Sequence, residues 1–191
     1  MWLAAAIAGV LVMHSFPSPH YGLPLLAPAA IAATPRLGGR RTRWLTALLL
    51  VAALIASQLL LAGQRRARGG ARDAARLEAA AAPHGGCLYV YDGPPALYRL
   101  THSCLPSRFV FPGHLDTANE ASAAGLGVDP VTETRRIMAS QPASVMLELP
   151  LFERGNRATL AIVTAELARH YVLAADVRTG KRHRLVYRRR G

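Results

Sequence analysis

A run of twenty residues without a charged side chain, from Trp44 to Gly63, constrains this chain more than any other feature. As an α-helix rising 1.5 Å per residue it would be about 30 Å long, which matches the hydrocarbon thickness of a bilayer. Arg43 and Arg65 flank the run, and Trp44 suits a membrane interface. A buried helix of a soluble protein rarely has this length with arginines at both ends. We therefore expect a transmembrane helix here.

Two shorter apolar segments precede this helix, at about residues 2–14 and 20–34. Each is too short to span a bilayer upright, and the prolines between them break any continuous helix. Together they favour a helical hairpin. A signal peptide over residues 1–20 is the alternative, and it is disfavoured because no Lys or Arg precedes the apolar run. The sequence thus predicts a multi-pass transmembrane region over residues 1–64.

The charges are distributed unevenly along the chain. All eleven acidic residues lie at or after Asp73, and residues 1–72 carry only arginines as charged groups. The net charge of +12 suggests nucleic-acid binding at first sight. Much of the excess flanks the apolar run, however, and no recognition motif accompanies it, so we expect no nucleic-acid partner. We expect the basic run at residues 181–190 to form an exposed edge strand and a solvated tail rather than a phosphate-binding strip.

Behind the apolar region the pattern is that of a small α/β domain. Residues 65–84 predict an Arg- and Ala-rich juxtamembrane linker helix, and residues 85–191 the domain itself. We expect helices at about residues 96–101, 116–124, 129–140 and 157–169, and strands at about residues 87–92, 108–112, 143–150, 171–177 and 183–189. Alternation of strands and helices predicts a mainly parallel sheet, closed by a C-terminal antiparallel hairpin around the turn at residues 178–181.

Two cysteines, Cys87 and Cys104, lie in this domain without a C-x-x-C or His/Cys cluster, so no metal site is predicted. A disulfide between them would stabilise the fold by about 3 kcal/mol in an oxidising compartment, and two free thiols are the alternative. The sequence contains no P-loop, no G-x-S-x-G, no H-E-x-x-H and no Gly-rich dinucleotide turn. We therefore predict no catalytic residue and no cofactor from motifs.

A few polar residues are candidates by position. Asp92 ends the first expected strand, where open α/β sheets often place working groups, although a turn-capping aspartate before Gly-Pro is the favoured interpretation. His102, Arg108 and His114 could meet near the same edge, although scattered polar surface residues would explain them equally well. Glu148 and Glu153 flank the end of another strand, and the simplest interpretation is that both are solvated.

One segment resembles a known family. DGPPALYRLTHSCLPSRFVFPGHL, residues 92–115, is similar to the opening of the extracytoplasmic C-terminal domain of bacterial polytopic membrane glycosyltransferases of the GT-C type. The similarity lies in Pro95, the Leu-Tyr-x-Leu-Thr stretch at residues 97–101 and the Pro-Ser-Arg-Phe-x-Phe-Pro stretch at residues 106–112. Upstream, residues 20–28 resemble the start of a late membrane helix of the same group, and both matches occur in the family's order.

The resemblance implies an orientation and a ligand class. Arginines on both sides of the apolar run leave the orientation open, but the family's topology implies a bacterial inner-membrane protein with an extracytoplasmic C-terminal domain. The implied partners are the membrane and a polyprenyl phosphate sugar or an envelope glycan. Residues carried over as lipid-phosphate contacts are Arg65, Arg66 and Arg68, and those carried over as substrate-binding residues are Asp92, Tyr98, Ser107, Arg108 and His114.

The chain also departs from the family. GT-C transferases place an acidic catalytic residue in an early extracytoplasmic loop, whereas no Asp or Glu precedes Asp73 here. The chain therefore corresponds to the last three hydrophobic segments and the terminal domain. We expect a truncated reading frame, a partner of a separate catalytic subunit, or a non-catalytic relative, and no catalysis by the chain alone. The competing hypothesis is a non-enzymatic membrane-anchored envelope domain that binds a partner or a glycan.

Overall fold

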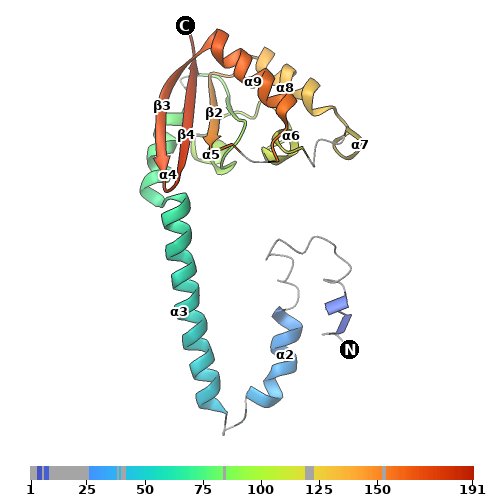
Figure 1. The fold of residues 1–191 in the computed structure, drawn as a ribbon, viewed down its shortest axis with the longest axis vertical. Coiled ribbons are helices and arrows are strands. Elements are labelled where there is room, and N and C mark those ends of the chain that lie inside the picture. Colours follow the sequence, from blue (N-terminus) through green and yellow to red (C-terminus); the bar gives the residue numbers. More distant parts are fainter. Residues whose placement is uncertain are drawn as a thin grey trace. The chain divides into compact units, whose positions relative to one another are not determined.

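The computed structural model describes residues 4–5, 7–8, 26–37, 39, 42–83, 85–118, 123–151 and 154–191. The chain divides into two compact units, Met1–Leu61 and Ala62–Gly191. Figure 1 shows the helices and strands of each unit. Most of the expected apolar segment at residues 2–14 and the turn that follows it lie outside the described residues, so the multi-pass arrangement stays a prediction.

The first unit contains helix α2, Leu26–Leu37, and most of helix α3, Arg43–Arg68. Among the described residues, one helical stretch is long and apolar enough to cross a membrane, and it includes α3. None of the residues of α3 is buried. Helix α3 therefore has the length and the exposed apolar surface that the charge-free run predicts.

The second unit is a mixed helix and strand domain. Its helices are α4 Ala71–Ala81, α5 Ala96–Leu100, α6 Gly113–Asp116, α7 Ala123–Leu126, α8 Pro130–Ala139 and α9 Arg157–His170. Its strands are β1 Leu88–Val90, β2 Ser144–Leu149, β3 Tyr171–Thr179 and β4 Arg182–Arg189.

The four strands form one mixed sheet in the order β1-β2-β4-β3. Strand β1 pairs with β2 in parallel, whereas β4 is antiparallel to both β2 and β3. The prediction of a mainly parallel sheet is therefore wrong. Strand β3, which follows α9, runs in the same direction as β2. After a tight turn, β4 lies between β2 and β3 and runs antiparallel to both. Strand β4 is thus an interior strand, and the expectation of an exposed edge strand at the basic run is also wrong.

Residues 108–112, expected to be a strand, form no strand in the structure. Prolines stand at both ends of this segment, at Pro106 and Pro112, and proline cannot donate to a sheet ladder. The segment instead packs Phe109 against the core. The sheet consequently has four strands rather than five.

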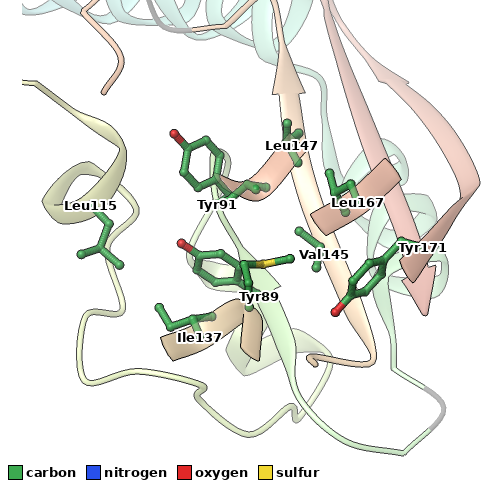
Figure 2. Packing of buried hydrophobic residues seen from close by; sticks show 10 residues of the cluster. Tyr89, Tyr91, Leu115, Ile137, Val145, Leu147, Leu167 and Tyr171 are labelled. Atoms are coloured by element: carbon green, nitrogen blue, oxygen red, sulfur yellow. The ribbon is translucent and has the colours of Figure 1, made fainter. Parts of the chain in front are cut away.

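Helices cover both faces of the sheet. Because side chains alternate along a strand, Tyr89 and Val145 face one core cluster, which α8 and α9 close, as Figure 2 shows for its labelled residues. Val90 and Met146 face a second cluster on the other side. Helix α4 contributes to that second cluster through Leu77 and Ala81, which lie four residues apart on one helix face. The segment expected to be a linker helix is therefore part of the domain.

The turn between β3 and β4 is bound to the last turn of α3, within the second unit. The backbone N–H of Lys181 donates to the carbonyl oxygen of Ala67 at 3.0 Å. Gly180 has φ +63°, and a Cβ atom at this position would lie 2.5 Å from the carbonyl group of Ala67. The close approach of turn and helix therefore requires glycine.

A disulfide joins Cys87 and Cys104 across a sequence separation of 17 residues. It ties the start of β1 to the segment that follows α5. Nearby, the backbone N–H of Leu88 donates to the Ser103 hydroxyl at 2.6 Å. Of the two alternatives that the sequence left open, a disulfide and two free thiols, the structure contains the disulfide.

Candidate functional site

A cleft of about 560 Å³ opens beyond the carboxyl ends of β1 and β2. This is the edge of an open α/β sheet where ligands usually bind. The polar and aromatic side chains that line it come from six separate stretches of the second unit: Arg68, Asp92, Phe111, Asp116, Thr117, Glu148, Arg182 and Arg184. Carboxylates, guanidinium groups and an aromatic ring therefore share one recess.

Asp92 reaches the cleft because the chain turns sharply after β1. Gly93 has φ +143°, and a Cβ atom there would lie 1.9 Å from the terminal methyl of Met146. The positive φ favours glycine at this position, and a larger residue would also require the flexible end of Met146 to move. Pro94 and Pro95 then lead into α5, so Asp92 is held at the sheet edge.

Asp116 forms part of the floor of the cleft and is 7 % exposed. It ends α6, and the Thr117 hydroxyl donates to its carboxylate Oδ1 at 2.9 Å. Its backbone carbonyl accepts from the N–H of Asn156, the residue that caps α9. These contacts connect the floor of the cleft to the amino end of α9.

A smaller cavity of about 250 Å³ adjoins the same carboxylates and is lined by Tyr91, Arg157 and several apolar residues in addition to Asp92 and Asp116. The Tyr91 hydroxyl lies 3.0 Å from the Thr159 hydroxyl. Burial raises the pKa of Tyr91 to about 12, so it stays a neutral hydroxyl at neutral pH. Asp92 and Asp116 therefore line two neighbouring cavities.

Two arginines on one wall of the cleft, Arg182 and Arg184, share the carboxylate of Glu148. Its carboxylate accepts from Arg184 Nε at 2.8 Å and forms an ion pair with Arg182 Nη1 at 2.9 Å. The side chains of Glu148 and Arg184 are 12 % and 11 % exposed, whereas that of Arg182 is 41 % exposed. The expectation that Glu148 is solvated is therefore wrong. Arg184 is a structural partner, and Arg182 is the guanidinium that a ligand can reach. Glu153 lies outside the described residues.

Two of the carried-over binding residues have structural roles. Tyr98 is buried, its hydroxyl accepts from the N–H of Val90 at 3.0 Å, and burial raises its pKa. Ser107 is also buried and donates to Glu133 Oε1 at 2.6 Å. The described residues that line the cleft include neither of them.

Arg108 and His114 flank an aromatic group beside the cleft. Arg108 donates from Nη2 to the carbonyl oxygen of Leu126 at 3.1 Å and lies 5.0 Å above the Phe109 ring. His114 packs edge-on against Phe109 and Phe111, with ring centroids 6.0 and 6.2 Å away. Phe111 is 62 % exposed and lines the cleft. His114 therefore supports the side chain that does face the site.

The three arginines expected to contact lipid phosphate all lie in the last turn of α3. Arg68 lines the cleft. Arg65 instead lines an open recess with Arg72 and Arg76 at the start of α4. Asp73 in that recess accepts from the N–H of Gly70, and this hydrogen bond, with a further one from Arg76, lowers its pKa.

Two residues that line the cleft were candidates from the sequence, Asp92 as a substrate-binding residue and Arg68 as a lipid-phosphate contact. The sequence analysis did not assign Phe111, Asp116, Glu148 or Arg182 to a site. A signal for the last two was present in the strand periodicity. Arg182 and Arg184 are two residues apart, so they lie on one face of β4, opposite a strand that carries a single glutamate. Asp116 carries no comparable signal, because its position depends on contacts with the distant Asn156.

The described residues contain no group of three or more His, Cys, Asp or Glu side chains arranged to hold a metal ion. The chain matches no protein-family model, no curated protein and no solved structure at a significant level.

Proposed function

We propose that this chain is a membrane-anchored extracytoplasmic domain that binds the sugar-phosphate head of a polyprenyl phosphate sugar in the cleft. In this proposal it is the C-terminal part, or a relative, of a GT-C-like membrane glycosyltransferase, and it does not catalyse transfer by itself. One observation carries the proposal: a single recess combines the carboxylates of Asp92 and Asp116 and an exposed ring with two arginines, Arg68 close behind the apolar run and Arg182 of β4.

The sugar would lie at the side of the cleft formed by Asp92, Asp116 and Phe111. Carboxylates accept hydrogen bonds from the hydroxyl groups of a sugar and can engage two at once. An exposed aromatic ring offers an apolar surface to the C–H face of a pyranose or furanose. Polar anchors beside an apolar surface are the general composition of a small-molecule site.

The phosphate would lie at the side formed by Arg68 and Arg182. The planar guanidinium fork matches the geometry of phosphate oxygens. Arg68 follows the end of the apolar run, Gly63, by five residues, or about 8 Å along a helix. This is the depth of the headgroup region, where the phosphate of a polyprenyl lipid lies.

An extracytoplasmic location is supported by the disulfide between Cys87 and Cys104, because disulfides persist in oxidising compartments. The arginines at residues 36–43 would then lie on the cytoplasmic side of a bacterial inner membrane. We infer that transfer is catalysed elsewhere, because residues 1–72 contain no carboxylate that could act as a general base.

The proposal can be tested by binding measurements on the full chain in nanodiscs of zwitterionic lipid. Polyprenyl phosphate mannose and bare polyprenyl phosphate are titrated in parallel. We expect D92N and D116N to weaken binding of the sugar lipid about tenfold each and to leave bare polyprenyl phosphate unaffected, whereas R182Q should weaken both. The matched control is D176N, an exposed aspartate paired with His183.

Equal affinity for both lipids, or unchanged binding by D92N and D116N, would reject the sugar site. Equal affinity for soluble glycan fragments without lipid would instead favour an envelope-binding module. A phosphatase fused at Gly191 gives an independent reading of topology, since activity requires export. A fusion that is inactive and cytoplasmic would reject the extracytoplasmic assignment.

A further inference from the structure

A second recess, of about 430 Å³, lies at the opposite end of the sheet from the cleft and is lined by Gln141, Arg169, His170, Arg189 and Arg190, with Gly191 at its edge. We propose that this recess, called here the distal recess, binds a phosphate group carried by a water-soluble molecule such as a phosphorylated sugar. The phosphate-binding role does not depend on the function proposed for the cleft, whereas the soluble source of the phosphate rests on the proposal that the cleft faces the lipid headgroups.

The fold brings these residues together from three segments that end at the same place. Helix α9 ends at His170, β4 ends at Arg189, and Gln141 follows the end of α8. The backbone N–H of Arg190 donates to the carbonyl oxygen of His170 at 2.8 Å. The N–H of Arg189 donates to the carbonyl oxygen of Ala143 at 3.1 Å. Backbone contacts therefore hold the arginines beside one another.

The positive charge of the distal recess is poorly compensated. Among the described residues, no carboxylate lies within ion-pair distance of Arg189 or Arg190. Glu166 reaches Arg169 and His170 only at 3.6 and 3.7 Å. By contrast, Arg136, Arg182 and Arg184 lie 2.7, 2.9 and 2.8 Å from a carboxylate oxygen. The arginines of the distal recess are therefore less closely paired than these three.

The carbonyl groups at the helix ends do not saturate these guanidinium groups. Arg189 Nη1 lies 3.4 Å from the carbonyl oxygen and the side-chain oxygen of Gln141, and Arg190 Nη1 lies 3.5 Å from the carbonyl oxygen of Arg169. These distances are at the outer limit of hydrogen bonding. Each contact uses one of the three guanidinium nitrogens, so most of the donors of each fork remain available.

Gln141, which lines the distal recess, has an unusual backbone conformation. Its φ is +50°, in the left-handed region that favours glycine, at the end of a helix where glycine would be the low-energy choice. Glycine, however, would remove the side-chain oxygen that lies 3.4 Å from Arg189 Nη1. Gln141 therefore adds a side-chain oxygen beside Arg189 at the distal recess.

Three exposed guanidinium groups around a polar recess are suited to a phosphate, because each fork can donate two parallel hydrogen bonds to its oxygens. The distance between the cleft and the distal recess favours a soluble molecule over a lipid headgroup as the source of the phosphate. Arg182 and Arg189 lie at opposite ends of β4, seven residues apart, or about 23 Å at 3.3 Å per residue. A lipid headgroup contacting Arg68 at the cleft cannot reach the distal recess, so we assign it to a soluble ligand.

The test uses the full chain in nanodiscs of zwitterionic lipid, titrated calorimetrically with inorganic pyrophosphate and with glucose 6-phosphate. We expect saturable binding that the double variant R169Q/R190Q weakens at least tenfold. The matched control, R99Q/R135Q, removes the same charge from two exposed arginines outside the distal recess and should change the affinity less than twofold. Thermal unfolding of both variants verifies that they are folded.

Equal weakening by the two double variants would show a general charge effect and overturn the proposal. Absence of saturable binding to the wild-type chain would overturn it as well. Binding to vesicles containing anionic lipid, with loss in R169Q/R190Q but no binding of pyrophosphate, would assign the recess to a membrane surface instead and contradict the soluble source. Selective loss of pyrophosphate binding, with R99Q/R135Q intact, supports it.

Discussion

Glu148 and Arg184 face each other directly across β2 and β4, and the guanidinium Nε donates to the carboxylate Oε2 at 2.8 Å. Arg182 holds the other carboxylate oxygen at 2.9 Å, so one glutamate serves two arginines. The pair lies at the wall of the cleft with both side chains almost fully covered. The stability of the sheet and the shape of the site therefore depend on the same contact.

We expect E148Q to lower the free energy of unfolding by about 3 kcal/mol, because it leaves Arg184 buried without its counter-charge. Urea unfolding of the full chain, monitored by far-ultraviolet circular dichroism, measures the loss of stability. The matched control is E166Q, whose partners are exposed and lie beyond 3.5 Å, and it should cost less than about 0.5 kcal/mol. Similar losses in the two variants would contradict the structural role assigned to Glu148.

G180A should destabilise the domain by at least about 1–2 kcal/mol, because alanine disfavours φ +63° and its Cβ would collide with the carbonyl group of Ala67. Thermal and urea unfolding measure the effect. For comparison, G125A adds a methyl group to open space and should be neutral or slightly stabilising. If G180A were as stable as the wild type, the close contact of the hairpin turn with α3 would be disproved.

Removing the disulfide with C87A/C104A should cost about 3 kcal/mol, because the bond restricts a loop of 17 residues in the unfolded chain. A thiol reductant should lower the stability of the wild type to about that of the double variant and leave the variant unchanged. Alkylation of the native, unreduced protein followed by mass spectrometry should find no modified cysteine. Two alkylated thiols in that sample would show that the bond is absent.

Glu133 should make the domain sensitive to acid. Hydrogen bonds from Arg136 and then from Ser107 lower its pKa below the ordinary 4.5, despite the opposing effect of burial. The folded state therefore binds this proton more weakly than the unfolded state, so the stabilisation is complete above pH 4.5 and is lost as the pH falls through the folded pKa. Because the Arg136 side chain is 54 % exposed, solvent weakens its ion pair with Glu133. We therefore expect Glu133 to contribute about 1–2 kcal/mol in total to the free energy of unfolding.

The measurement compares urea unfolding of wild type and E133Q between pH 3 and pH 7. The difference in unfolding free energy should be largest at pH 7 and should shrink below pH 4.5. E78Q, at a glutamate of α4, serves as the control and should show no such trend. A difference between wild type and E133Q that does not change with pH would assign the effect to packing instead of charge.

Elements with strong local signals could be predicted from the sequence. Helix α8 begins after Asp129, whose carboxylate accepts from the N–H of Thr132, and Pro130 occupies its first position. The apolar run at residues 143–150 became β2, and the turn at residues 178–181 became the β3–β4 hairpin. In each case the information lies within a few neighbouring residues.

The strand order and the cleft could not be predicted in the same way, because they depend on contacts between distant segments. Insertion of β4 between β2 and β3 is fixed by pairing such as Leu149 with His183. Asp92, Asp116 and Arg182 are far apart in sequence and meet only after the sheet has formed. Ser107 lies in a motif that resembles a binding sequence, yet its partner Glu133 gives it a structural role.

The hydrogen bond from Lys181 to Ala67 has one more consequence for the cleft. Each of these residues is followed at once by a cleft arginine, Arg182 in one segment and Arg68 in the other. Their backbones are thereby kept at a constant spacing, so an anion bound in the cleft, as we propose, would have to immobilise only the two arginine side chains. Such binding would cost less conformational entropy. A rotation of the last turn of α3 would also displace Arg182, whose ion pair with Glu148 connects it to β2.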